Sequence, residues 1–226
     1  MNAKLTAALL VLAAVLANVA FTALGSIFNY PDVLDEPAGQ VLADFRDNEG
    51  AVSGWFAVLA LSAALLAPVA IGVGRLSGRP AMRIAVRVGI AAAVVQVVGL
   101  LRWPLLVPGY AADGNADAFT TAGDILGTAI GETLGYLLTA TWTALVIVAL
   151  GRRYAGRWFQ LLGAASAGLI LLGVLSPLGL PVIDTANFLG YVLWSVWLIA
   201  FAVVMLVAER RRSAAPASAS RGAVTT

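Results

Sequence analysis

Six apolar stretches, each long enough to cross a lipid bilayer, dominate this sequence. They cover residues 5–28, 52–73, 84–101, 125–150, 159–175 and 183–207. A membrane-spanning helix needs about 20 mostly apolar residues, and a backbone in lipid must satisfy its own hydrogen bonds, as a helix does. The sequence therefore predicts an all-α, polytopic membrane protein in which residues 1–212 form a bundle of six transmembrane helices.

The basic residues indicate how these spans are oriented. Of the fourteen, all except Arg46 and Arg102 lie before the first span, around the turns after the second and fourth spans, or after the sixth. The acidic residues except Glu209 lie in the other loops or in the span halves that face them. Because loops rich in Lys and Arg stay in the cytoplasm, we expect both termini to be cytoplasmic and loops 29–51 and 103–123 to face outward.

Two segments outside the spans have features of their own. Val41, Leu42 and Phe45 follow helical spacing among charged residues, which predicts a short amphipathic helix in the first outward loop. Residues 213–226 are small and polar without any periodicity. We expect this segment to be a disordered cytoplasmic tail.

Several kinds of chemistry are excluded by residue types that the chain lacks. It has no Cys and no His, and its one lysine is Lys4. Thiol redox chemistry, the usual haem and zinc sites, and a Schiff-base cofactor inside the bilayer are therefore excluded. No paired carboxylates at metal-binding spacing, nucleophile with a base or phosphate-binding loop is present. We expect no catalytic residue, metal or cofactor, and no nucleic-acid partner, since the basic residues flank spans.

The fourth predicted span is the richest in polar groups. At about 100° per residue, one face of a helix carries the polar series and a neighbouring face carries a row of glycines. The polar series is Asp124, Thr128, Glu132, Thr139 and Thr143, and the glycines are Gly123, Gly127, Gly131 and Gly135. Glycines at this spacing let another helix approach closely. We therefore predict a central fourth span with a packed glycine face beside a polar face.

Arg102 and Glu132 are predicted to lie at the same depth. Each is eighteen residues from the inner end of its predicted span, or about 27 Å at 1.5 Å per residue. Opposite charges at one depth favour an ion pair. Two interpretations stay open: the pair neutralises two costly charges between packed helices, or it faces a ligand.

Other polar residues extend this candidate pocket. Asn18 and Thr22 share a face of the first span, and Gln96 lies near the middle of the third. Each alone is more typical of a helix–helix contact than of a binding site. Together with Arg102, Glu132 and Thr128, they form the candidate polar pocket.

The sixth span carries an aromatic stripe at three-residue steps. Its members are Tyr191, Trp194 and Trp197. Such a stripe is typical of helix packing, and the alternative is that it forms the wall of a site for an apolar ligand.

Three short motifs resemble those of a known family. They are Asn29-Tyr30-Pro31 after the first span, Arg102-Trp103-Pro104 at the end of the third, and Gly131-Glu132 with Gly135 in the fourth. They resemble a bacterial family of six-span membrane proteins known only as a domain of unknown function. The resemblance covers almost the whole chain to about Arg212. It implies a multi-pass protein of the bacterial cytoplasmic (inner) membrane, and it supplies no activity.

Three functions remain open at this point. The first is a sensory, accessory or structural subunit in the bilayer, with a membrane-protein partner or a second copy of itself. The second is a binding or transport protein with an outward-facing pocket around Arg102 and Glu132 for an unknown ligand. The third and least favoured is an enzyme acting on a lipid or isoprenoid, because Arg102 would keep Glu132 ionised and so a poor proton donor.

Overall fold

Helices make up nearly all of the computed structural model, which describes residues 2–214. None of these residues belongs to a strand, so the predicted all-α class is confirmed. The described part of the chain contains six helical stretches long and apolar enough to cross a membrane, which matches the predicted number. They are Ala3–Phe28, Glu49–Leu76, Pro80–Asp113, Ala116–Leu150, Arg152–Leu178 and Pro181–Arg211.

Most spans combine several helical segments. In chain order the segments are α1 (Ala3–Phe28), η1 (Asp32–Asp35), α2 (Ala38–Asp47), α3 (Glu49–Ala64), α4 (Leu66–Val73), η2 (Gly74–Leu76), α5 (Pro80–Leu105), α6 (Val107–Asp113), α7 (Ala116–Ala122), η3 (Gly123–Leu134), α8 (Gly135–Leu150), α9 (Arg152–Leu172), η4 (Gly173–Leu178) and α10 (Pro181–Ala214). The third and fourth spans extend well beyond the apolar stretches 84–101 and 125–150, because helical hydrogen bonds continue into the polar segments that hydropathy leaves out.

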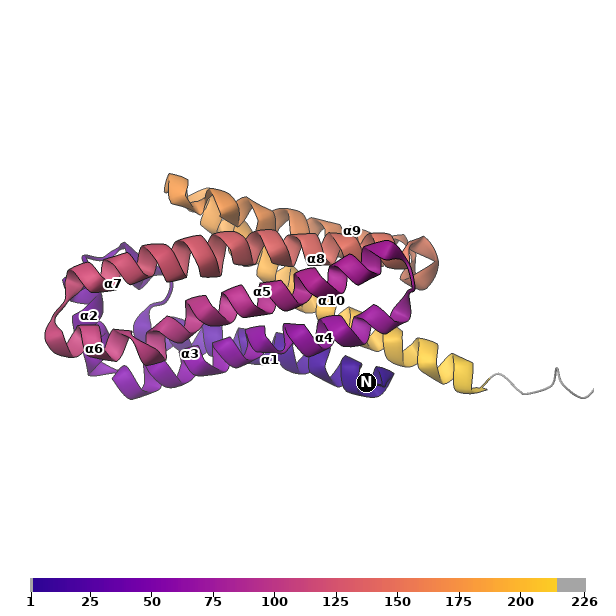
Figure 1. Cartoon of the computed structure of the whole chain (residues 1–226), viewed down its shortest axis with the longest axis horizontal. Helices are drawn as coiled ribbons and strands as arrows, with labels where there is room; N and C mark the ends of the chain where they lie inside the picture. Colours follow the sequence, from indigo (N-terminus) through magenta and orange to yellow (C-terminus); the bar gives the residue numbers. More distant parts are fainter. Residues whose placement is uncertain (1, 215–226) are drawn as a thin grey trace, which may run out of the picture.

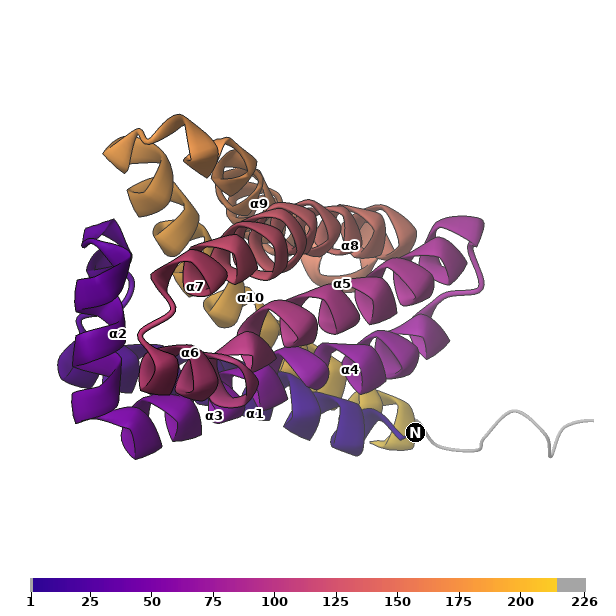
Figure 2. The same cartoon turned by 60° about the vertical axis from the view of Figure 1, so that its left-hand side comes forward.

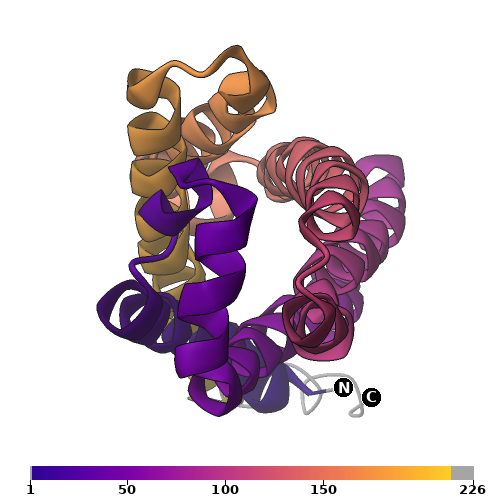
Figure 3. The ribbon, with the colours of Figure 1, turned by 90° about the vertical axis from the view of Figure 1, so that its left-hand side faces the viewer.

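The spans form a ring in which neighbours in sequence are neighbours in space. α1 packs against α3, α3 against α5, α5 against α8, α8 against α9, and α9 against α10, which closes on α1. The end-on view in Figure 3 shows this arrangement. Short antiparallel connections between consecutive elements favour such an order. No described helix runs through the middle of the ring, so the expectation of a central fourth span is wrong: this span is part of the wall.

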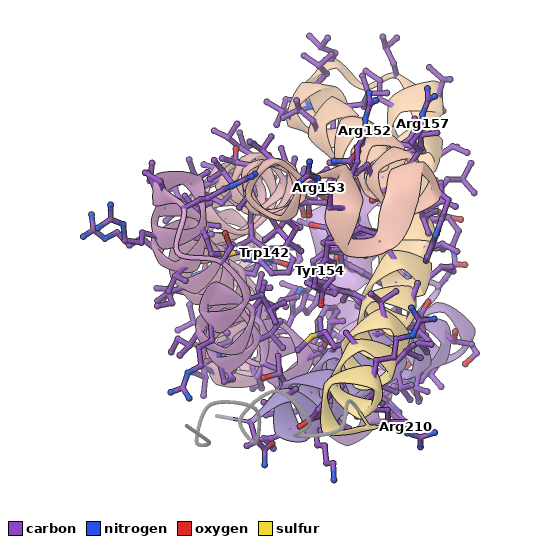
Figure 4. All side chains as sticks on the ribbon, turned by 90° about the vertical axis from the view of Figure 1, so that its right-hand side faces the viewer. Trp142, Arg152, Arg153, Tyr154, Arg157 and Arg210 are labelled. Carbon is purple, nitrogen blue, oxygen red and sulfur yellow. The ribbon has the colours of Figure 1, made fainter. Side chains whose placement is uncertain are left out.

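The two ends of the bundle differ in charge. The start of α1, the end of α10 and the turns after η2 and α8 lie together at the right of Figure 1. Arg152, Arg153, Arg157 and Arg210 gather at this end (Figure 4), which we call the arginine-rich end. α2, α6 and the start of α7 lie at the opposite, acidic end (Figure 1). Which end faces the cytoplasm stays a prediction from the charge pattern.

Buried side chains form two separate apolar cores. The core nearer the arginine-rich end takes residues from all six spans, including the fully buried Trp142, Trp197 and Phe201. The core at the acidic end takes its buried residues from the first three spans, η1 and α2, and Phe119 of α7 packs against it. In it, Trp103 stacks on Phe56 with ring centroids 4.5 Å apart.

The predicted amphipathic helix is confirmed as α2. Val41, Leu42 and Phe45 are each at most 2 % exposed, and all three belong to the core at the acidic end. Figure 3 shows α2 lying across this end of the ring. The apolar face of α2 therefore fastens it to the bundle as a partial cover.

The expected C-terminal tail begins inside a helix. α10 continues to Ala214, so residues 213–214 extend the sixth span. The rest of that tail, residues 215–226, lies outside the described residues.

We expect the acidic end to face outward and the arginine-rich end to face the cytoplasm. The chain has no cysteine, so single cysteines at the exposed positions Asn48, Asp113, Gly78 and Arg152 can each be tested alone. A membrane-impermeant thiol reagent applied to intact cells should label the first two and spare the last two. Labelling at Gly78 or Arg152 before the cells are permeabilised would contradict this orientation.

Candidate functional site

The fourth span changes its winding in the half nearer the acidic end. Gly123–Leu134 form a π-helix between α7 and α8. Its i→i+5 hydrogen bonds widen each turn beyond the roughly 3.6 residues of an α-helix. Residues four apart therefore fall more nearly in line than in an α-helix. Because of this winding, the glycine row and the polar row Thr128, Glu132 and Tyr136 each run more nearly parallel to the helix axis.

The glycines of η3 bring its backbone against α5. A Cβ atom added to Gly99 would lie 2.6 Å from the Cα of Gly131, and one added to Gly131 would lie 2.9 Å from the Cα of Gly99. A Cβ added to Gly127 would lie 2.8 Å from the guanidinium carbon of Arg102. The first contact brings two backbones together, and the second leaves room for a charged side chain.

The same row continues toward the middle of the bundle. A Cβ added to Gly135 would lie 2.9 Å from Cγ of Gln96 on α5. We call Gly99, Gly127, Gly131 and Gly135 the glycine seam. Gly123 is different, because nothing lies within 4 Å of a Cβ added there.

The seam holds Arg102 in a buried position. Arg102 is 8 % exposed, and its Nη1 donates a hydrogen bond of 2.7 Å to the carbonyl oxygen of Gly99. Its guanidinium carbon lies 5.3 Å from the centroid of the Trp103 ring. A guanidinium has five N–H donors, and among the described residues Arg102 makes no other hydrogen bond or ion pair. None of its other nitrogens is among the fully buried atoms that lack a hydrogen-bond partner, and guanidinium donors that protein groups leave free can bind an anion or a polar group.

Glu132 lies close to Arg102 without touching it. The two charges interact electrostatically, and their common depth in a membrane stays a prediction. Within the described part of the chain, however, no ion pair with an N···O distance of 4.0 Å or less joins them. A direct pair therefore stays a prediction.

Three tyrosines surround Glu132. Tyr30, Tyr136 and Tyr191 each interact electrostatically with it. Burial raises the pKa of Tyr30 to about 12, the charge of Glu132 adds to the rise, and Arg102 opposes it. The Tyr30 phenol is therefore protonated near neutral pH and is available as a hydrogen-bond donor. We call Arg102, Glu132 and the three tyrosines the outer polar cluster, where outer means the half of the bundle nearer the acidic end.

Local structure explains how Tyr30 reaches this cluster. Asn29 adopts the left-handed conformation, with φ of 49°, and ends α1, a role that Asn tolerates better than most residues. The turn brings the Tyr30 ring to 5.1 Å from Phe56 and 6.4 Å from Trp103. The Asn29-Tyr30-Pro31 motif is therefore a turn that carries a phenol back to the bundle.

Toward the arginine-rich end, the polar groups satisfy one another. Gln96 donates to the hydroxyl of Thr139 at 3.1 Å, and Tyr191 also hydrogen-bonds to Thr139. The indole of Trp194 donates to the hydroxyl of Thr143 at 2.8 Å. These hydrogen bonds join α5, α8 and α10 across the middle of the ring.

Beneath these hydrogen bonds lies a layer of packed aromatic rings, the aromatic floor. The Trp142 ring lies 5.9 Å from Trp197, which lies 5.2 Å from Phe159 and 5.3 Å from Phe201. Trp197 is fully buried and donates a hydrogen bond of 3.1 Å to the Phe159 carbonyl. Figure 4 places Trp142 inside the bundle. The indole rings of Trp142 and Trp197 therefore belong to a closely packed layer of aromatic side chains.

The outer polar cluster lies where packing is least complete. Residues 123–134, 173–178 and 181–193 contribute to neither apolar core. Glu132 and the three tyrosines are half-buried rather than buried. Figure 2 shows the outer ends of α9 and α10 diverging from α2 and α7. Glu132 and Tyr191 therefore belong to segments that lie outside both apolar cores.

Two residues of the predicted pocket lie elsewhere. Asn18 donates to the carbonyl of Ala14 and to the hydroxyl of Ser195 on α10, and Thr22 donates back to the Asn18 carbonyl. Both side chains are exposed on the bundle surface, and no hydrogen bond of the described residues joins them to Arg102 or Glu132. Thr128 is half-buried, one turn from Glu132.

Two members of the cluster and one neighbouring residue are not among the site residues predicted from the sequence. Tyr136 follows Glu132 by four residues and Tyr30 belongs to a quoted motif, so both carried a usable signal. Asp184, which interacts electrostatically with Glu132, carried none, because its proximity depends on how the sixth span packs.

Two surface pockets lie away from the cluster. One, of about 400 Å³, lies between α6, α7 and η3, where Tyr110 and Ile125 contribute to its lining. The other, of about 350 Å³, lies at the arginine-rich end. Neither is lined by Arg102 or Glu132. No group of three or more acidic residues that could hold a metal ion occurs among residues 2–214.

These features define a multi-pass helical membrane protein with one polar cluster in one half of its bundle. Residues 5–202 match DUF4386, a domain of unknown function. The chain therefore belongs to this family, which confirms the predicted resemblance. Searches of curated proteins and of solved structures found no match to the chain.

The close contact along the glycine seam predicts that Gly131 and Gly123 of η3 differ sharply in how well they tolerate substitution by alanine. Gly131→Ala places a methyl group against the Gly99 backbone, so it should lower stability by about 1–3 kcal/mol, as overpacking does. Gly123→Ala meets open space and should leave the melting temperature unchanged or slightly raised. Thermal unfolding of both variants in detergent measures the difference in melting temperature. Equal melting temperatures would contradict the close contact between Gly131 and Gly99.

A double-mutant cycle measures whether Arg102 and Glu132 interact directly. Arg102→Ala and Glu132→Ala should each destabilise the protein. If the two charges meet, the double variant should recover part of the loss, with a coupling energy of about 0.5–3 kcal/mol. Strictly additive losses in thermal unfolding would show that the two residues act independently.

Proposed function

We propose that this protein is a receptor-like or accessory membrane subunit that binds a small anionic molecule from its acidic, outward end. The observation that carries this proposal is the buried Arg102 guanidinium, whose one hydrogen bond to protein goes to the Gly99 carbonyl. It lies close to the half-buried Glu132 and to Tyr30.

The chemistry of the cluster favours a particular class of ligand. A guanidinium binds carboxylates and phosphates through paired hydrogen bonds. The Tyr30 phenol adds a neutral donor. Glu132 offers an acceptor near Arg102, which suits a ligand hydroxyl or ammonium group. The best match is a small carboxylate or phosphate that also carries a hydrogen-bond donor.

The aromatic floor favours a receptor or accessory role over a channel. A path through the bilayer would need to pass Gln96, Thr139 and Thr143, whose side chains are engaged with one another or with aromatic residues. Below them, Trp142 and Trp197 are fully buried. Binding at the acidic end is therefore expected to change contacts between helices, without opening a continuous route through them.

A thermal-shift screen tests this function. Phosphate, succinate and glutamate should be added to the purified protein at constant ionic strength, with chloride as the reference anion. A ligand at about one hundred times its Kd stabilises the folded state by about 2.7 kcal/mol. We expect at least one of these anions to raise the melting temperature, and Arg102→Gln to abolish the increase.

Arg46→Gln is the matched control, because it removes one positive charge from the exposed surface of α2 at the same end. It should retain the wild-type response. An equal response in Arg102→Gln would contradict binding at the cluster, and no response to any of the three anions would count against the proposed ligand class.

A further inference from the structure

A groove at the arginine-rich end lies between the start of α9 and the end of α10. Its volume of about 350 Å³ is within the range of about 300–1,000 Å³ that small-molecule sites occupy. It is lined by Tyr154, Val203, Val204, Val207, Ala208 and Arg211. The outer polar cluster contributes nothing to this lining.

The part of the groove nearer the middle of the bundle is apolar and is supported by packed aromatic rings. The Tyr154 ring packs 5.9 Å from Phe201 and 6.2 Å from Phe159, so it rests on the aromatic floor. Val203 and Val207 are 54 % and 42 % exposed. At this depth a bilayer presents hydrocarbon chains, and exposed valines match that chemistry.

The part of the groove nearer the arginine-rich end of the bundle carries a positive charge. Arg211 follows Val207 by four residues, which is about one helical turn. Arg152, Arg153 and Arg157 lie on α9 at the same end of the bundle, opposite the end of α10 (Figure 4). Glu209 is the one acidic residue at this end within residues 2–214, so this end as a whole is positively charged, and Arg211 is the charged residue that lines the groove.

The order of these two parts matches one kind of molecule. From Val203 to Arg211 the helix rises about 12 Å, from an apolar surface to a positive charge. A phospholipid has the same order, from acyl chain to phosphate. Basic sites between spans at the cytoplasmic side bind anionic lipid headgroups. A soluble phosphate would leave the valines uncovered, and the ammonium group of a zwitterionic lipid would offset the attraction between its phosphate and Arg211.

We propose that this groove binds one anionic phospholipid from the leaflet at the arginine-rich end. Its acyl chain lies along the α10 valines and Tyr154, and its phosphate contacts Arg211. This site is independent of the outer polar cluster and of any ligand bound there.

The test measures lipid binding to the purified full-length protein in detergent. Native mass spectrometry should count bound molecules while phosphatidylglycerol or phosphatidylcholine with identical acyl chains is titrated. The protein should bind one phosphatidylglycerol more tightly than phosphatidylcholine. Arg211→Gln should weaken phosphatidylglycerol binding about fivefold, which corresponds to about 1 kcal/mol for one basic residue. Val207→Trp, which fills the groove, should remove the preferred site.

Matched controls separate this site from general attraction to basic surfaces. Arg46→Gln removes an arginine at the other end, and Val196→Trp enlarges a half-exposed valine of α10 that does not line the groove. Both should bind phosphatidylglycerol as the wild type does. Glycerol phosphate, which lacks acyl chains, should not compete. Equal binding of the two lipids, unchanged binding by Arg211→Gln, or competition by glycerol phosphate would overturn the proposal.

Discussion

The contact between the backbones of Gly99 and Gly131 sets the geometry of the outer half of this bundle. In lipid, helices gain little from the hydrophobic effect and associate through close packing. Here a Cβ on either glycine would come within 3 Å of the other residue's Cα atom. The π-helical winding of η3 lines up further glycines along the same contact. This contact fixes how α5 and η3 approach, and therefore where Arg102 and Glu132 lie.

The bundle is consequently built in two different ways along its length. Near the arginine-rich end, all six spans share one core of alanines and aromatic rings. Near the acidic end, the first three spans and α2 form a second core, against which Phe119 of α7 packs, while η3, η4 and the start of α10 stay outside it. Charge and phenol groups occupy this less completely packed half. A packed core in one half and a polar cluster in the other suit the proposed ligand binding more than passage across the membrane.

The sequence predicted the fold class well, because hydropathy reports directly on the bilayer. The six helices long enough to cross a membrane and α2 follow from composition and periodicity. The ring order does not follow from them, because a helical wheel shows which residues share a face and not what that face contacts. For this reason Asn18 and Thr22, grouped with the pocket by polarity, lie on the surface between α1 and α10. The π-winding of η3 also depends on packing against α5, which no local residue preference encodes.

The most direct test of this account is the affinity of Gly127→Ala for the anion that stabilises the wild-type protein. The added methyl group meets the guanidinium of Arg102, at the end of a flexible side chain, so the fold should accommodate it while the guanidinium moves. The charge of the protein is unchanged. Titration calorimetry should show affinity reduced at least about tenfold, or about 1.4 kcal/mol, with a melting temperature close to that of the wild type. Wild-type affinity in Gly127→Ala would contradict the claim that the glycine seam positions Arg102 to bind a ligand.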